Sequence, residues 1–294
     1  MTGRKKMFEH CVVAGGTGAV GRMFADRLAA SDAEVLCVDP AATGPGTIAD
    51  DIRAPGPATA RALARADLVL LAVPEAVALD AVRPVTGLMA ADALFADTLS
   101  VKEGIARCLR TQAPRIQAVG LNPMFAPSLP LSGRPVAAAV VNDGPAVRAL
   151  LELVAGWGAR VVEMTPEEHD RQTAAQQAAT HAAVLAFGLA LGELGVDIAA
   201  LRATAPPPHR TLLQLLARVA SGTPEVYRDV QAANPHAGAA RQAVGHGLER
   251  LGRAVADGSP AAFEALVDEL RSTLGPRHLT ELAASCAESF ARLR

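Results

Sequence analysis

The sequence predicts two domains: an α/β domain built on a parallel sheet, followed by an all-helical domain. In the first half, short apolar runs alternate with stretches of helical spacing, a pattern typical of strands joined by crossover helices. After Thr165 the strand signals stop. We therefore place the domains at residues 1–165 and 166–294.

The expected strands are short apolar runs. They are Cys11–Ala14, Glu34–Val38, Leu68–Val73, Leu94–Asp97, Gln117–Gly120, Val136–Val141 and Arg160–Glu163.

The helical half is predicted to open with a long helix. Thr165, Pro166 and the acids Glu167 and Glu168 have the order of an N-cap, a first-turn proline and first-turn acids. The helix is expected to reach about Leu194. Later helices are expected to break at Pro206–Pro208, Gly222–Pro224, Pro235, Gly258–Pro260 and Gly275–Pro276.

The long helix is rich in Ala and Leu and has few charges after Arg171. A helix that is apolar nearly all round is usually buried. We expect a second copy of the chain to bury it, and hence a homodimer.

Composition excludes several classes of protein. With 294 residues, half of them hydrophobic, the chain is long enough for a sizeable core, and its net charge of −2 gives no electrostatic case for nucleic-acid binding. The four cysteines lack metal-ligand or redox spacing, so we expect reduced thiols and no metal. No apolar run reaches membrane-spanning length, and none of signal length follows the basic residues 4–6, so we expect a cytoplasmic protein.

A glycine motif predicts a dinucleotide site. Gly16-Thr17-Gly18-Ala19-Val20-Gly21 follows an expected strand and opens a helix, and Asp39 ends the next strand. Gly16 is expected to allow the tight turn, Gly18 the approach of the pyrophosphate, and Gly21 close helix packing. Asp39 would accept hydrogen bonds from the ribose hydroxyls and repel a 2′-phosphate, which favours NAD over NADP.

Val73 and Pro74 end another strand, where loops border the ligand crevice of such domains. A plain turn after the strand is the alternative for this pair, as a glycine-rich turn without a ligand is for the motif.

Polar motifs follow the later strands: Asp97–Lys102, Gly120–Pro127 and His169-Asp170-Arg171, with Gln177 and His181 further along. Together they resemble the prephenate dehydrogenase family over almost the whole chain. The resemblance implies a Rossmann-type NAD-binding domain followed by a helical dimerisation domain. It also implies hydride transfer from C4 of a cyclohexadienyl dicarboxylate to NAD, with loss of a carboxylate as CO2.

The resemblance assigns roles to two residues of the strand-end motif. Ser100 matches a serine near the C4 substituent and the nicotinamide, although it would also suit an N-cap for a helix beginning near Lys102. Lys102 matches a family lysine and is expected to bind substrate; a surface lysine is the alternative.

On the long helix, His169, Thr173, Gln177 and His181 are four apart and are expected to share one face. We expect His169 and Gln177 to bind substrate, and His181, which matches a family histidine beside the pocket, to be catalytic. A structural histidine held by its neighbour Asp170 is the alternative for His169.

Arg210 and Arg218 match two family arginines. Guanidinium groups suit carboxylates because they bind them in bidentate fashion. The resemblance makes Arg218 the carboxylate clamp and Arg210 its support; solvated surface arginines are the alternative.

Asn122 stands where the family has a catalytic histidine. An amide cannot be a general base near neutral pH. A C4 amine needs a strong base less than a hydroxyl does, and an amide oxygen can accept its N–H. We therefore hypothesise the substrate 4-amino-4-deoxyprephenate and the product 4-aminophenylpyruvate, in the biosynthesis of a 4-aminophenylalanine-derived antibiotic.

Three alternatives remain open. The chain could be a prephenate or arogenate dehydrogenase with His169 or water as the base, or a non-catalytic NAD-binding regulator. It could also be a β-hydroxyacid dehydrogenase, although those rely on a lysine that the long helix lacks.

Overall fold

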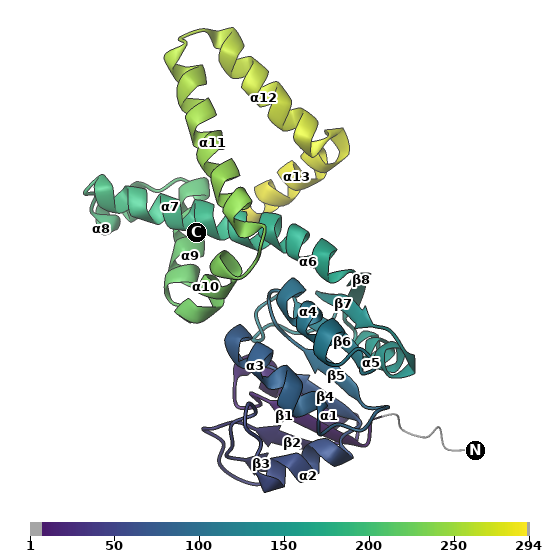
Figure 1. The fold of residues 1–294 in the computed structure, drawn as a ribbon. Helices are drawn as coiled ribbons and strands as arrows, with labels where there is room; N and C mark the ends of the chain where they lie inside the picture. The colour runs from purple at the N-terminus through teal and green to yellow at the C-terminus, as the bar shows by residue number, and fades with distance from the viewer. Residues whose placement is uncertain (1–7, 293–294) are drawn as a thin grey trace. The chain divides into compact units, whose positions relative to one another are not determined.

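The computed structural model describes residues 8–292, which form two compact units (Figure 1). The first unit runs to Thr173 and also includes Arg228–Pro235. The second comprises Ala174–Tyr227 and the chain from His236 onwards. The domain boundary at residue 165 stays a prediction. The basic residues 4–6 lie outside the described part of the chain.

The first unit contains one eight-stranded sheet with the order β3-β2-β1-β4-β5-β6-β7-β8. Its strands are β1 (His10–Ala14), β2 (Glu34–Val38), β3 (Thr47–Ile48), β4 (Leu68–Leu71), β5 (Leu94–Asp97), β6 (Gln117–Pro123), β7 (Pro135–Asn142) and β8 (Arg160–Met164). The predicted strands all form, and the two-residue β3 is an addition to them. The predicted parallel sheet has one antiparallel pair, β6 with β7.

Helices cover both faces of this sheet (Figure 1). On one side lie α1 (Ala19–Ala30) and α5 (Pro145–Gly156), and on the other α2 (Pro57–Arg65), α3 (Glu75–Thr86) and α4 (Glu103–Gln112). The strands are apolar on both faces: in β1, Cys11 and Val13 join one core while Val12 and Ala14 join the other. Such near-continuous apolar runs are what a sheet buried on both sides requires.

The strand β6 extends past its predicted end and includes Asn122. The prediction placed Asn122 after the strand, but it pairs with Ala137 of β7, and Pro123 pairs with Val136. The antiparallel partner satisfies the backbone of these extra residues, which is information that the sequence of β6 does not contain.

The predicted long helix is divided into α6 (Pro166–Thr173), a π-helical segment η1 (Ala174–Ala179) and α7 (Thr180–Glu193). Its start is confirmed as a capping box, since Glu168 N–H donates to Thr165 Oγ1 and Thr165 N–H donates to Glu168 Oε2. The π-helical segment interrupts the predicted α-helix between Thr173 and Thr180. The expected common face of His169, Thr173, Gln177 and His181 stays a prediction.

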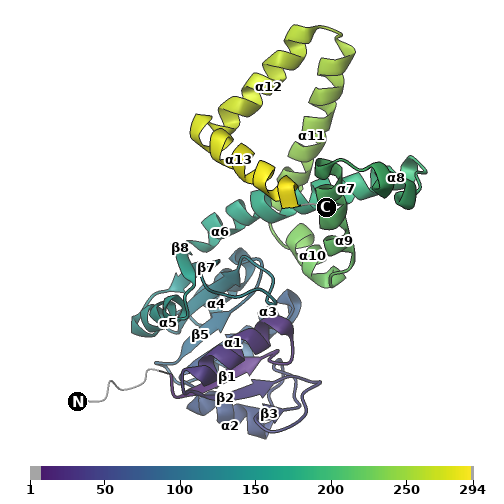
Figure 2. The same cartoon turned by 180° about the vertical axis from the view of Figure 1, so that it is seen from behind.

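The rest of the second half is helical, as predicted (Figure 2). The helices are α8 (Ile198–Thr204), α9 (Pro207–Ala220), α10 (Pro224–Ala232), α11 (Ala237–Ala256), α12 (Pro260–Leu274) and α13 (Pro276–Arg292). All five predicted breaks fall between helices. Proline cannot continue a helix but suits its first turn, and at four of the five breaks a proline opens the next helix.

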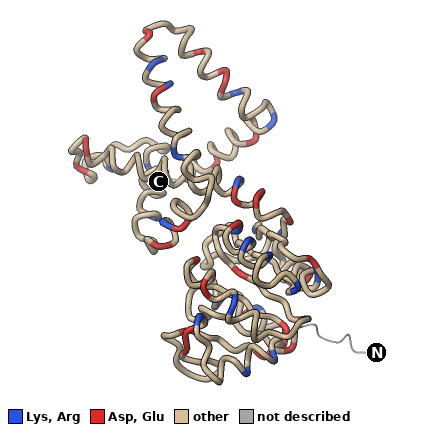
Figure 3. The backbone as a smooth tube through the Cα atoms, in the orientation of Figure 1, with Lys and Arg blue, Asp and Glu red and all other residues tan. Residues whose placement is uncertain are grey.

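Charges of both signs are interspersed within each unit (Figure 3). Among the described residues, no single helix is long and apolar enough to span a membrane; one pair bent by 113°, Pro166–Glu193 with Ile198–Thr204, passes that test together.

Candidate active site

The turn after β1 depends on Gly15, one residue before the predicted motif. Gly15 has φ +76°, and a Cβ there would lie 2.1 Å from the carbonyl oxygen of Ala72. The expected tight-turn role of Gly16 stays a prediction: its φ is not positive, and a Cβ there would lie 2.5 Å from Cys37 Sγ. The expected role of Gly21 agrees with the structure, since a Cβ there would lie 2.2 Å from Gly15 O. The loop therefore lets α1 begin directly against the end of β1.

Asp39 follows β2 and is held in place by two hydrogen bonds. Thr17 Oγ1 donates to its Oδ2 at 2.5 Å, and the Ala41 N–H donates to its Oδ1 at 2.9 Å. A carboxylate has further lone pairs, so both oxygens keep the capacity to accept a ribose hydroxyl.

Val73 and Pro74 form the loop between β4 and α3. Because β4 is the neighbour of β1, this loop and the glycine loop meet at the point where the strand order reverses. Ligands of open α/β sheets bind at that edge.

Asn122 lies in a buried polar cluster with His169 and Asp170. Asn122 Nδ2 is 3.0 Å from His169 Nε2, and His169 Nδ1 is 2.8 Å from Asp170 Oδ1. The side chains of His169 and Asp170 are fully buried, and Asn122 is 4% exposed. Burial lowers the pKa of His169 below its ordinary value, against the opposing effect of Asp170. The imidazole is therefore neutral at pH 7.

This geometry corrects the expected role of His169. Both ring nitrogens are used inside the first unit, and none of the side chain is exposed, so His169 has no atom left for the predicted direct contact with substrate. The alternative of a histidine held by Asp170 agrees with the structure.

Asp170 joins this cluster to the start of α4. Its Oδ1 and Oδ2 accept the backbone N–H groups of Lys102 and Glu103, each at 2.8 Å. These are the donors that a helix start leaves unsatisfied. Asn234 fixes the other side, because its Nδ2 donates to the Asp170 carbonyl at 2.8 Å and lies 3.2 Å from Thr173 Oγ1.

The sequence analysis missed the roles of Asp170 and Asn234. Their partners lie more than sixty positions away along the chain, so no local pattern could reveal them. The nearest signal in the sequence was Pro235, directly after Asn234, and it predicted only a break between helices.

Lys102 was expected either to bind substrate or to lie at the surface. The structure shows instead that it is buried. Its Nζ lies 2.5 Å from Asp97 Oδ1 and donates to the Leu121 carbonyl at 3.1 Å, and its side chain is 1% exposed. Gly120 makes room for it, since a Cβ there would lie 2.6 Å from Lys102 Cδ. The predicted substrate contact is therefore replaced by an ion pair with the end of β5 and a hydrogen bond to β6.

Ser100 lies in the loop between β5 and α4, and it is only partly buried. The alternative role as an N-cap is wrong, because α4 begins at Glu103 and its N-terminal donors bond to Asp170. Ser100 therefore keeps its hydroxyl for another partner.

Glu75 is a further acid that the analysis missed. It opens α3 directly after Pro74. Partial burial and the charges of Asp229, Asp170 and Asp97 raise the pKa of Glu75 to about 7, while Lys102 opposes the shift.

In the second unit, His181 lies within the electrostatic influence of Arg218. His181 meets the ring of Tyr227 edge-on, with 5.0 Å between centroids. Burial and the nearby Arg218 charge lower the pKa of His181. Its Nδ1 is buried and has no hydrogen-bond partner among the described residues. A buried polar atom in this state needs a partner from outside the single chain.

Arg210 lies apart from Arg218 on α9. Its Nε donates to the Ala205 carbonyl at 3.1 Å, and it lines a cavity of about 860 Å³ together with Arg202. Arg218 is exposed and does not line that cavity. Gln177 lies in the π segment, half-buried.

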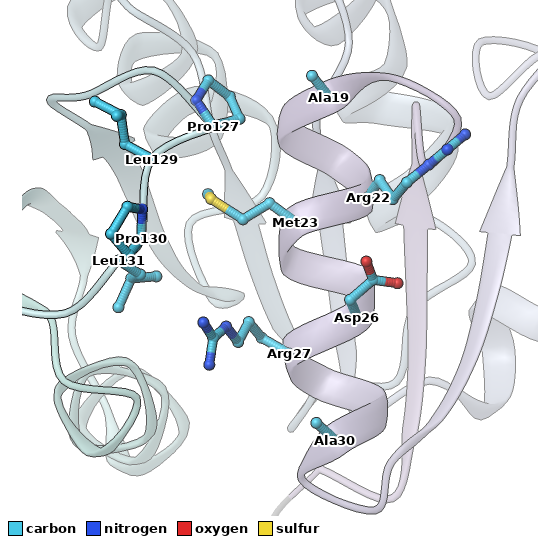
Figure 4. A pocket seen from close by; sticks show the side chains of 10 residues that line it. All are labelled: Ala19, Arg22, Met23, Asp26, Arg27, Ala30, Pro127, Leu129, Pro130 and Leu131. Carbon is cyan, nitrogen blue, oxygen red and sulfur yellow. The ribbon is translucent and has the colours of Figure 1, made fainter.

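Figure 4 shows a second cavity, of about 510 Å³, between α1 and the loop that follows Asn122. It is lined by Met23, Asp26 and Arg27 from the helix and by Pro127, Leu129 and Pro130 from the loop, among others. Ala19 is the only predicted site residue in its lining.

Both halves of the chain match domains of one family. Residues 51–163 match the prephenate dehydrogenase nucleotide-binding domain, and residues 165–271 match the prephenate dehydrogenase dimerisation domain. The glycine loop lies before residue 51, so its assignment depends on the fold.

Among curated relatives, the 4-amino-4-deoxyprephenate dehydrogenase of Streptomyces pristinaespiralis is 62% identical over 291 residues, covering 98% of both chains. The T-protein of Haemophilus influenzae is 28% identical over 221 residues, which cover 74% of this chain and 55% of that protein.

Solved structures share the fold. Prephenate dehydrogenase from Aquifex aeolicus has a TM-score of 0.72 at 17% identity, covering 90% of this chain and 98% of the other. Arogenate dehydrogenase from Synechocystis has a TM-score of 0.68 at 16% identity, with the same coverage. The predicted fold class and cofactor are confirmed: the chain belongs to the prephenate dehydrogenase family, with an NAD-binding Rossmann-type domain followed by the family's helical dimerisation domain.

Proposed function

We propose that the chain converts 4-amino-4-deoxyprephenate to 4-aminophenylpyruvate and CO2. The observation that carries the proposal is Asn122, a neutral amide at the position where the family has its basic histidine. The 62% identity to a 4-amino-4-deoxyprephenate dehydrogenase supports the same substrate.

NAD, when bound at the glycine loop and Asp39, supplies the hydride acceptor. The hydride leaves C4, the ring carboxylate leaves C1 as CO2, and the ring becomes aromatic. The electron demand at C4 is met by the nitrogen lone pair of the neutral amine, which donates more strongly than a hydroxyl oxygen does. The chain therefore has to orient the amine and does not have to remove a hydroxyl proton.

Asn122 is proposed to accept the amine N–H, and Ser100 to hydrogen-bond near C4. In the helical unit, Arg218 is proposed to hold a substrate carboxylate, His181 to line the pocket beside it, and Gln177 and Arg210 to support them. The electrostatics support this assignment, because the Arg218 guanidinium is near enough to His181 to lower its pKa.

The alternative with His169 as the base is disfavoured. Its Nε2 is bonded to Asn122 and its Nδ1 to Asp170, so it has no free nitrogen to accept a substrate proton. We also propose a homodimer formed through the helical domain, a cytoplasmic location, and a role in making a 4-aminophenylalanine-derived metabolite.

The direct test compares NADH formation with 4-amino-4-deoxyprephenate and with prephenate at saturating NAD. We expect turnover of the amino compound and little or none of the hydroxy compound. Efficient turnover of prephenate would make the chain an ordinary prephenate dehydrogenase. No turnover of either would favour an NAD-binding regulator.

A further inference from the structure

The buried cluster around Asn122 has a defined hydrogen-bond direction. Asp170 accepts two backbone N–H groups as well as contacting His169 Nδ1. A carboxylate only accepts hydrogen bonds, so His169 Nδ1 must carry a proton and donate it. In a neutral imidazole the other nitrogen then has no proton, so His169 Nε2 is an acceptor.

The acceptor at His169 Nε2 decides which end of the Asn122 amide faces it. Only the NH2 group of the amide can donate, so Nδ2 must point to His169, as observed at 3.0 Å. The amide oxygen Oδ1 then points away from the histidine. A flipped amide would bring two acceptors together inside a buried site, which leaves both unsatisfied.

We propose that His169 is a positioning residue for Asn122, and that Asp170 sets its tautomer. In this arrangement Oδ1 of Asn122 is the atom offered to the C4 substituent, which makes the site an acceptor for a substrate N–H. This inference rests on the proposed function for its substrate, but the hydrogen-bond direction itself does not.

The same arrangement has a consequence for a histidine at position 122. The acceptor His169 Nε2 would take the N–H of the new imidazole and leave its second nitrogen without a proton. His169 therefore serves either an amide acceptor or an imidazole base, and the residue at position 122 selects the chemistry.

The chain offers a direct spectroscopic test, because it contains only three asparagines, Asn122, Asn142 and Asn234. In protein labelled with 15N-asparagine, three side-chain amide signals are assigned by single substitution. Asn142 is the internal control, since its Nδ2 donates to the Ile116 carbonyl at 2.9 Å, away from the cluster.

We expect His169→Leu to shift the Asn122 amide signals, while those of Asn142 stay in place. His169→Gln retains an acceptor and should restore the Asn122 signals toward their original positions. Unchanged Asn122 signals in folded His169→Leu would overturn the inference.

A second variant keeps the test valid if His169→Leu fails to fold. Asn122→Asp has no N–H to donate, so its carboxylate can bond to His169 only if Nε2 gains a proton. We expect the pKa of His169, followed by 15N-histidine NMR, to rise above its ordinary value. A histidine with a purely structural role would keep its lowered pKa, and that result would also overturn the inference.

Kinetics separate this inference from the proposed function. With 4-amino-4-deoxyprephenate, His169→Leu should lower kcat on the order of 10²-fold with a smaller change in KM, because the acceptor is misplaced while the carboxylate contacts remain. In an Asn122→Ala background the same substitution should have no further effect on kcat, and additive losses would contradict positioning through Asn122. No turnover by the unsubstituted enzyme would overturn the proposed function, and the NMR result would still decide the inference.

Discussion

At the scale of single residues, position 122 is the one we propose to determine the chemistry. The surrounding groups are buried and their hydrogen bonds are paired, so a change at this one side chain alters what the site offers to the C4 substituent. An amide supplies a fixed dipole, whereas an imidazole supplies a base.

Restoring a base at this position should open the site to the hydroxy substrate. We expect Asn122→His to raise kcat/KM for prephenate by roughly 10- to 100-fold, within the range that general-base catalysis contributes. The gain should be lost below about pH 6.5 as the new imidazole is protonated. Initial rates of NADH formation from pH 5 to 9 measure both effects. Asn122→Ala is the matched control and should show no gain; equal activity of the two variants would argue against the missing-base explanation.

Glu75 should make the stability of the chain depend on pH. Because its folded pKa, about 7, lies above the ordinary value of 4.5, the folded state binds more protons between these two values. Its contribution to stability is therefore present below about pH 4.5 and is lost as the pH rises through 7. We expect Glu75→Gln to unfold at a higher urea concentration than the unsubstituted chain at pH 8, and the gap to narrow at pH 5. A gap that does not change with pH would mean that Glu75 is not the group that titrates.

Among secondary-structure elements, the turn from β1 into α1 depends on the close approach of two backbones. Gly15 has a left-handed φ and lies against Ala72, just after β4. A side chain there would therefore strain the backbone and clash with the Ala72 carbonyl. A motif search that begins at Gly16 does not include it.

We expect Gly15→Ala to destabilise the chain by about 1–3 kcal/mol from backbone strain alone, and to weaken NAD binding as α1 shifts. Gly156, in the last turn of α5, has an ordinary φ and nothing within 4 Å of a Cβ, so Gly156→Ala is the control. Alanine is the better helix former, so the control should be neutral or slightly stabilising. Urea unfolding and NAD titration measure the two effects; similar losses in both variants would contradict this account of the turn.

At the scale of the whole molecule, the helical unit exposes apolar side chains that a single chain cannot bury. On α7 only Val184 is buried, while Leu189 is 71% exposed and Leu194, directly after the helix, is 72% exposed. Exposed apolar surface of this kind marks an interaction site, and the match to a dimerisation domain indicates a second copy as the partner.

A charge on α7 should therefore disrupt the homodimer. We expect Leu189→Glu to sediment as a monomer at micromolar concentration, because the glutamate would be buried without a partner at the interface. Leu129→Glu is the matched control: the leucine is 42% exposed in the first unit, and the variant should remain dimeric. Sedimentation velocity distinguishes the species. A dimeric Leu189→Glu would exclude this face of α7 from the interface.

The strands, the helix breaks and the glycine loop could be predicted from the sequence, because each depends on neighbours within a few positions. Apolar runs define buried strands, Gly and Pro define ends, and the Thr165–Glu168 box defines a helix start. The resemblance to a family also led to the prediction that Asn122 selects the substrate, which stays a prediction.

The surroundings of Asn122 could not be predicted, because they depend on contacts between distant parts of the chain. The antiparallel partner of β6, the burial of Lys102 against Asp97, and the contacts of Asp170 with α4 and of Asn234 with Asp170 all join residues far apart in the chain. A π-helical segment, Ala174–Ala179, also interrupts the long helix that was predicted to be continuous. Hydrogen-bond direction depends on which donors and acceptors meet in space, and this is why His169 changed from an expected ligand to the residue that orients Asn122.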